Sequence, residues 1–393
     1  MTSIEQLARP ASEAEGERRT SYLELFFDLV FVFAITQVTA VLVEDTSAAG
    51  FGRAALLLGL VWWAWGGYAW MTNAIDVESI LVRSAMIAAA AGAFFMALAV
   101  PQAYGEDGIW FATAYLGIRV LHVALYVWGL RGDRAHQRAV LKLAPWFLVA
   151  PVVAFAGGLA EGDLRVLLWA VSLAIDVLGA LNVAGAGFRV SPSHFAERYA
   201  LFMIIALGES VVAVGAGAAE LPRDATFVAA VAIAFGGVAA MWWAYFDFTA
   251  LAAERALRFA SEERRGPLAR DVFSIFHFPT VLGIIFYAVA AKKTIAHPHD
   301  PLSQGGRVAL GLGIALYLLG PVLGRFRITG HVSWDRLVGG AAAVAVALAL
   351  DGVDALWVLA VVIGVLVLTS LHELRRLGEA RRRIRAEEAH AAH

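Results

Sequence analysis

The chain has 393 residues, of which 60% are hydrophobic and only 16% are charged, and its mean hydropathy is +0.70. Soluble domains contain about 45–50% apolar and about 25% charged residues, so both values indicate an integral membrane protein. The sequence has no cysteine, which excludes disulfides, thiolate metal sites and a cysteine nucleophile.

Residues 1–21 form a polar segment before the first apolar stretch. Residues 1–20 carry four Glu and three Arg and lack the basic start and short apolar core of a signal peptide. We therefore expect a cytoplasmic N-terminal segment, followed by an apolar stretch that stays in the protein as a helix.

Twelve apolar stretches are long enough, or nearly so, to cross a bilayer core about 30 Å thick, which takes roughly 20 helical residues. The last two stretches are the least certain, because the turn Asp351-Gly352-Val353-Asp354 between them is very short and 335–350 is short and rich in alanine. We expect an all-α bundle of about 12 transmembrane helices at 22–43, 52–72, 80–100, 108–130, 138–158, 164–187, 195–217, 225–250, 269–291, 306–324, 335–350 and 354–373.

Lysine and arginine mark one side of the predicted bundle. The N-terminus and every second loop after it carry 22 of these residues, whereas the opposite side carries six. Cytoplasmic loops are enriched in Lys and Arg, so this bias predicts that the N-terminus is cytoplasmic. An even number of spans returns the C-terminus, with its Arg-rich tail at 374–393, to the same side.

Matching motifs suggest that the chain contains an internal repeat. Trp62-Trp63-Ala64-Trp65 of the second span resembles Trp242-Trp243-Ala244-Tyr245 of the eighth, and Ser21 to Glu24 lines up with Ser193 to Glu197. Six spans per repeat give both halves the same orientation in the membrane. The sequence thus predicts two parallel six-helix repeats, at 22–187 and 188–373.

Charged residues within spans are costly, so each needs a partner, water or a function. Glu24 and Asp28 are four residues apart and share one face of the first helix. Two carboxylates this close disfavour each other's ionisation, which suits binding of a cation or a proton. The structural alternative is a pair neutralised by Arg83, or by Arg198 of the other half.

Further polar residues extend this candidate path. Glu209 and Ser210 lie deep in the seventh span, and their repeat partners, Thr36 and Gln37, are also polar. A shared site or ordinary interhelical hydrogen bonding both explain this pattern. Three more candidates complete the predicted path, namely Glu197, Asp247 at the end of the eighth span, and His277 two residues before Pro279.

Arg119 and Asp176 both lie near the middle of their spans. The economical interpretation is a structural ion pair between them, with His122 on the same helix face as Arg119. We find no motif for a metal or a cofactor, and we expect neither.

Two stretches carry a family resemblance: Tyr22-Leu23-Glu24-Leu25-Phe26-Phe27-Asp28-Leu29-Val30-Phe31-Val32-Phe33-Ala34, and Glu197 to Ser210. Together they resemble the bacterial low temperature requirement protein A family. The resemblance implies an inner-membrane protein linked to growth in the cold and brings no biochemical activity. The stretch from Phe27 also resembles the first-helix motif of a lysosomal potassium/proton channel family, although Phe27 replaces its Ser and Leu201 stands where Asp28 would repeat.

The leading hypothesis is translocation of an ion or small solute along a polar path between the two repeats. The alternatives are a membrane-embedded lipid-modifying enzyme and a non-transporting adaptor in cold or stress adaptation, with an enzyme the less expected. The expected partners are the lipid bilayer of the bacterial inner membrane, the solute, and a second copy of the chain if it oligomerises. We expect no nucleic acid as a partner.

Overall fold

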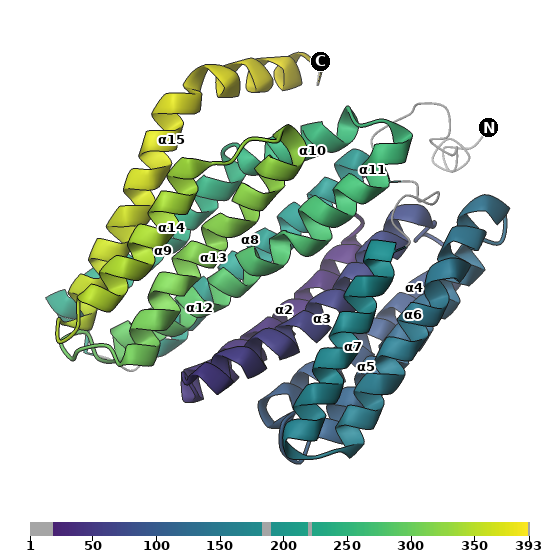
Figure 1. The fold of residues 1–393 in the computed structure, drawn as a ribbon, viewed down its shortest axis with the longest axis horizontal. Coiled ribbons are helices and arrows are strands. Elements are labelled where there is room, and N and C mark those ends of the chain that lie inside the picture. The colour runs from purple at the N-terminus through teal and green to yellow at the C-terminus, as the bar shows by residue number, and fades with distance from the viewer. Residues whose placement is uncertain (1–18, 183–189, 219–221, 392–393) are drawn as a thin grey trace, which may run out of the picture.

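The computed structural model describes residues 19–182, 190–218 and 222–391, and these residues form helices without a β-strand. Eleven helices are long and apolar enough to cross a membrane. They lie side by side in two groups, purple to teal and green to yellow in Figure 1. The all-α, polytopic fold predicted from the sequence is therefore confirmed.

The first group comprises six helices, which pack in a closed ring. Within it, α2 contacts α3 and α4, α4 contacts α5, α5 contacts α6, α6 contacts α7, and α7 contacts α3. The bounds are α2 (Tyr22–Glu44), α3 (Ala48–Ala74), α4 (Ile80–Ala99), α5 (Gly108–Gly129), α6 (Arg134–Leu159) and α7 (Gly162–Asn182).

The second group repeats this order of neighbours. Here α8 packs on α9 and α12, α12 on α13, α13 on α14, α14 on α15, and α15 on α9. The bounds are α8 (Pro192–Ala218), α9 (Ala225–Phe246), α12 (His277–Ala296), α13 (Gln304–Thr329), α14 (Trp334–Ala349) and α15 (Ala355–Ala391). We call the two groups the first half and the second half.

Two short helices interrupt the second half where the sequence predicted a simple loop. The predicted span 225–250 ends early, because α9 stops at Phe246, and α10 (Thr249–Arg258) and α11 (Glu262–Ala269) follow. A π-helical segment, Arg270–Ile275, then leads into α12. Such segments are rare and often mark functional positions, so this junction is relevant to the site.

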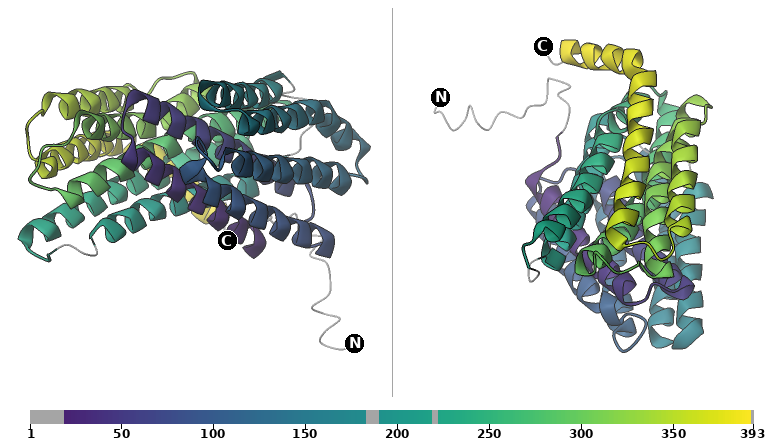
Figure 2. Two further views of the ribbon diagram at one scale, coloured as in Figure 1. Left: turned by 90° about the horizontal axis from the view of Figure 1, so that it is seen from below. Right: turned by 90° about the vertical axis from the view of Figure 1, so that its left-hand side faces the viewer.

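One predicted span and the predicted tail differ from the observed helices. The helix predicted at 335–350 is α14, whose 16 residues are fewer than a helix needs to cross the hydrocarbon core. The tail predicted at 374–393 continues α15 to Ala391, and the last turns bend away from the bundle (Figures 1 and 2). The end of the sixth predicted span, 183–187, lies outside the described residues.

The two halves meet where α2, α8 and α12 pack against one another. The span Glu262–Ala296, which contains α12, is the most enclosed of the described spans, with 78% of its most apolar stretch buried. Close backbone approach explains part of this burial, since a Cβ on Gly283 would lie 2.5 Å from the carbonyl oxygen of Gly313 on α13. α12 and α13 therefore pack with their backbones in close contact.

Candidate functional site: a buried charge cluster between the halves

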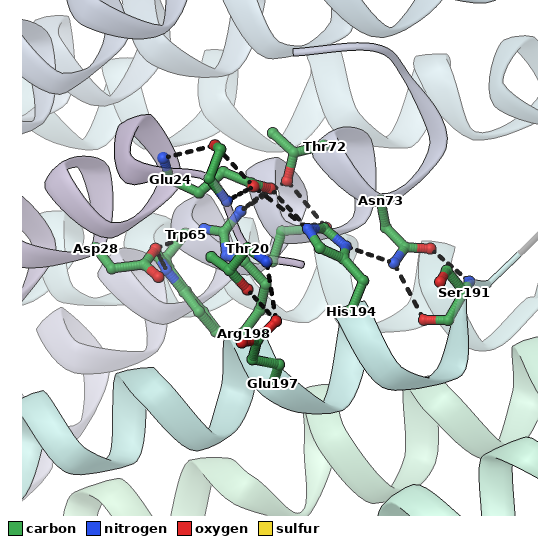
Figure 3. Close-up of polar contacts among 12 residues, drawn as sticks. Thr20, Glu24, Asp28, Trp65, Thr72, Asn73, Ser191, His194, Glu197 and Arg198 are labelled. Carbon is green, nitrogen blue, oxygen red and sulfur yellow. Dashed lines mark hydrogen bonds and ion pairs between the residues drawn. The ribbon is translucent and has the colours of Figure 1, made fainter. Parts of the chain in front are cut away.

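The start of α2, the start of α8 and the end of α3 meet in a network of buried polar side chains (Figure 3). Arg198 of α8 lies between two carboxylates of α2, with nitrogen-to-oxygen distances of 2.9 Å to Glu24 and 2.5 Å to Asp28. All three side chains are 0% exposed. The ion pairs therefore connect the two halves within the bundle, and we call this network the charge cluster.

Local sequence explains how Glu24 reaches Arg198. Ser21 caps α2, and its hydroxyl oxygen accepts from the backbone N–H of Glu24. The Glu24 carboxylate in turn accepts from the backbone N–H of Ser21 at 2.9 Å, which completes a capping box. The helix start therefore fixes this carboxylate before it contacts the second half.

Polar groups of α3 form further hydrogen bonds with Arg198 and Asp28. Arg198 donates to the hydroxyl of Thr72 at 2.6 Å, and the indole N–H of Trp65 donates to Asp28 at 2.7 Å. The Trp65 ring also lies 6.0 Å from the guanidinium carbon of Arg198, in cation–π geometry. Charged groups inside an apolar bundle need this many partners, because burial removes their hydration.

His194 extends the charge cluster along α8. Its Nε2 lies 3.2 Å from Glu24, and its Nδ1 lies 3.0 Å from the amide nitrogen of Asn73. Asn73 also accepts from the backbone N–H of Ser191 at 3.0 Å. A continuous chain of polar contacts thus runs from Asp28 to the segment that precedes α8 (Figure 3).

The charges of the cluster do not cancel by ion pairing alone. Two carboxylates share one guanidinium, and the second oxygen of Asp28 has no hydrogen-bond partner in the described structure although it is buried. An unpaired buried carboxylate oxygen is costly unless a proton, a cation or water reaches it. This oxygen is where the arrangement can accept a positive charge.

A second polar level lies farther along the same two helices. Glu209 of α8 is 8% exposed, and Thr36 of α2 and Lys292 of α12 are the polar groups near enough to act on its carboxylate. The adjacent Ser210 is fully buried, and its hydroxyl has no partner among the described residues. Gln37 is half-buried at the same level of α2.

The other predicted path residues have different partners, although Glu197 lies beside Arg198 (Figure 3). Glu197 accepts two hydrogen bonds from Thr20, just before α2. His277 contacts the Tyr245 hydroxyl at 2.6 Å and the Val272 carbonyl oxygen at 2.8 Å, inside the second half. Asp247 is the C-cap residue of α9, and its backbone N–H donates to the Trp243 carbonyl oxygen at 3.1 Å.

Arg119 and Asp176 form a direct ion pair in the first half, with both side chains 0% exposed. Tyr115 donates a further hydrogen bond to Asp176 at 3.0 Å. His122, one turn from Arg119, has no hydrogen-bond partner on either ring nitrogen within the described part of the chain. This pair belongs to the interior of the first half and not to the interface.

Arg198, and not Arg83, pairs with the two carboxylates of α2. Arg83 is 53% exposed and pairs with Glu78 at the surface. Sequence reasoning missed the contributions of Thr72, Asn73 and His194. Only His194 carried a signal, since it stands within the stretch of α8 that lines up with the start of α2.

The described residues contain no group of three or more His, Asp or Glu side chains placed to hold a metal ion. The cluster instead offers carboxylates, a guanidinium, an imidazole and hydroxyls in mutual contact. Such a set can bind or exchange a small cation or a proton, and it can also simply hold two helices together.

Comparison with known proteins identifies the family. The family model described as bacterial low temperature requirement A protein (LtrA) matches residues 19–371. A protein of Rhizobium meliloti (strain 1021), described as uncharacterized, is 33% identical over 323 residues, which cover 78% of this chain and 77% of that protein. The chain therefore belongs to the bacterial low temperature requirement A family.

Proposed function

We propose that the protein translocates an ion or small solute, with a small cation favoured, along the interface of α2 and α8. In this proposal it lies in the bacterial inner membrane with both termini in the cytoplasm. Support comes from the 11 spanning helices and the shorter α14, which packs between α13 and α15 and makes the number of passes even. The Lys and Arg bias between the two sides and the polar interface between the halves support it as well.

The two halves act as parallel repeats in this proposal. The same order of neighbouring helices in both halves supports the repeat, as do the matching Trp-rich motifs. In proteins with parallel repeats, the interface between the repeats is where a transport site forms. α2 and α8 are the first helices of the two halves, and they pack directly against each other.

The observation that carries the proposal is the buried oxygen of Asp28 that lacks a partner. Glu24 and Asp28 have two negative charges against the one positive charge of Arg198, so a cation that reaches Asp28 would restore neutrality. An anion would meet the surplus carboxylate instead. The favoured substrate is thus a cation, a proton included.

Glu209 and Thr36 provide the next polar position on the route. Thr36 is eight residues after Asp28 on α2, which is about 12 Å along a helix that rises 1.5 Å per residue. A cation that leaves Asp28 toward the other side of the membrane therefore meets Glu209 as its next carboxylate. In the state described here, Arg198 closes the route by holding both carboxylates of the first level.

Ion flux into proteoliposomes tests the proposal directly. The purified protein should conduct one of potassium, sodium or protons down an imposed gradient. Glu209→Gln should reduce this flux at least tenfold with little change in stability, because glutamine keeps a polar side chain of the same size and Glu209 has no ion pair with Arg198 to lose. Asp351→Asn is the matched control, since the Asp351 carboxylate is 77% exposed and pairs with Arg307, which is not part of the charge cluster.

Asp28→Asn separates a role in the route from a role in folding. Flux lost in a variant that still unfolds at the wild-type temperature would place Asp28 on the route. Wild-type flux in both Glu209→Gln and Asp28→Asn would contradict the proposed path. No flux of any ion would instead favour the lipid-modifying enzyme or the adaptor.

A further inference from the structure

A cavity of about 720 Å³ lies between the first half and the segment that leads into α12, and the proposed path does not use it. It is lined by α3, α5, α6 and α7 and by α11 and the π-helical segment. Cavities of roughly 300–1,000 Å³ are typical of small-molecule sites. Asn73 and Ser191 belong both to its lining and to the polar chain that reaches Glu24.

The second half has a smaller cavity of about 480 Å³ at the equivalent place. It lies among α9, α13, α14 and α15 and is covered by α10. Its deepest arginine, Arg336, is held by Glu373, by Thr249 and by the carbonyl oxygen of Ala244. No lining residue of this second cavity leaves a buried polar atom unpaired in the described structure.

The first cavity differs because it has unpaired polar atoms at its buried end. Arg119 pairs with Asp176, but its Nε–H has no partner among the described residues. Neither ring nitrogen of His122 has one, and both residues line the cavity while being 0% exposed. A neutral imidazole offers one donor and one acceptor, so donors exceed acceptors at this end.

Aromatic rings supply much of the remaining wall. The indole N–H of Trp62 donates to the Ser274 carbonyl oxygen at 2.7 Å, and that of Trp70 donates to the Ser274 hydroxyl at 2.9 Å. These hydrogen bonds satisfy the polar atoms of both rings, which leaves mainly apolar surface. The aromatic residues of the lining are Trp62, Trp63, Trp70, Tyr126 and Phe147.

The charges at the buried end of the cavity are paired. Asp176 compensates Arg119 and Asp271 pairs with Arg270, whereas the two glutamates of the lining are exposed to solvent. Paired charges give a charged ligand no net attraction, and burying an unpaired charge would cost free energy. The cavity therefore suits an uncharged molecule.

We propose that this cavity binds a small, uncharged aromatic molecule that carries a carbonyl group. The carbonyl oxygen accepts hydrogen bonds from Arg119 Nε and from His122, and the aromatic body packs against the tryptophans. The proposal does not rest on translocation, because binding is an equilibrium property of the protein at rest.

Equilibrium dialysis of 2-naphthamide against the full-length protein in zwitterionic nanodiscs tests the proposal. We expect saturable binding of one molecule per chain. Gly66→Leu should weaken binding at least tenfold by filling the cavity, since a Cβ on Gly66 meets only the Tyr199 hydroxyl, at 3.9 Å. Gly236→Leu is the matched control, because a Cβ on Gly236 on α9 meets nothing within 4 Å.

His122→Phe keeps a ring at the buried end but removes its hydrogen-bonding atoms, and it should weaken binding about tenfold. The control is His372→Phe, since the side chain of His372 is 66% exposed on α15. Thermal unfolding of each variant establishes that it is folded. Equal binding by wild type and both cavity variants would overturn the proposal, as would absence of saturable binding to the wild type.

Charge analogues of the probe test the predicted neutrality. 2-Naphthoate and 2-naphthylmethylammonium have the same ring system, with a negative or a positive head group. Both should bind at least tenfold more weakly than 2-naphthamide. Tighter binding of either analogue would show that the cavity selects a charge, which contradicts the pairing of charges at its buried end.

Discussion

The second helices of the two halves carry similar motifs but make different contacts. Trp65 of α3 donates to Asp28 of α2, which is also bound to Arg198 of the other half. At the matching position of α9, Tyr245 contacts His277 of α12, within its own half. The polar contact of the first half therefore extends across the interface, whereas that of the second half stays local.

The neighbouring tryptophans differ in the same way. Trp62 is 3% exposed and contacts the π-helical segment, whereas Trp242 and Trp243 are 46% and 49% exposed. Exposed tryptophans on a spanning helix face the lipid or its boundary, where an amphipathic ring is favourable. Similar motifs thus place a helix in the fold without fixing what its side chains contact.

Removal of Arg198 should have the largest effect, because it breaks the contact between the halves. Arg198→Met leaves Glu24 and Asp28 buried without their cation, which should lower the free energy of unfolding by about 3–5 kcal/mol. Chemical unfolding in mixed micelles measures this change. Adding Glu24→Gln and Asp28→Asn should recover a large part of it, and a loss below about 1 kcal/mol in the single variant would contradict the central role of the ion pairs.

Breaking the Arg119–Asp176 ion pair inside the first half should lower the free energy of unfolding somewhat less than removing Arg198. Arg119→Met should lower the free energy of unfolding by about 3 kcal/mol, at the low end for buried pairs, because Tyr115 still donates to Asp176. The same unfolding experiment measures it. Adding Asp176→Asn should reduce the loss, and a larger loss than in Arg198→Met would reverse the ranking of the two sites.

Trp65→Phe and Tyr245→Phe test the difference between the second helices of the two halves most directly. Trp65→Phe removes a hydrogen bond to a charged carboxylate and should cost about 2 kcal/mol, whereas Tyr245→Phe should cost about 1 kcal/mol. Thermal unfolding of both variants ranks them. Trp243→Phe controls for loss of an indole at a lipid-facing position, and an equal cost of all three would remove the distinction between the halves.

The smallest effects should come from the exposed ion pairs. Arg83 and Glu78 are 53% and 65% exposed, and Arg376 is 49% exposed beside Asp335. Solvated pairs contribute about 0–1 kcal/mol, so Arg83→Ala and Arg376→Ala should change the free energy of unfolding by less than about 1 kcal/mol. A larger loss in either variant would show that its pair supports the bundle.

Much of the fold could be predicted from the sequence, but the composition of the site could not. Glu24, Asp28 and Arg198 stood out because charges are rare within apolar spans. Thr72 and Asn73 gave no such signal, since hydroxyl and amide side chains are ordinary in membrane helices. The break after α9 was also missed, because 225–250 is apolar enough to resemble one uninterrupted span.

The sequence by itself determined the class of protein, the approximate spans and the residues that need a reason to be buried, because hydropathy and helix length follow from residue order. Only the tertiary structure decided the partners: Arg198 rather than Arg83 for the carboxylates of α2, and the Tyr245 hydroxyl for His277. The physical reason is that a buried polar group must find its partner on whichever helix packs against it, and helix packing depends on the shapes of all neighbouring side chains.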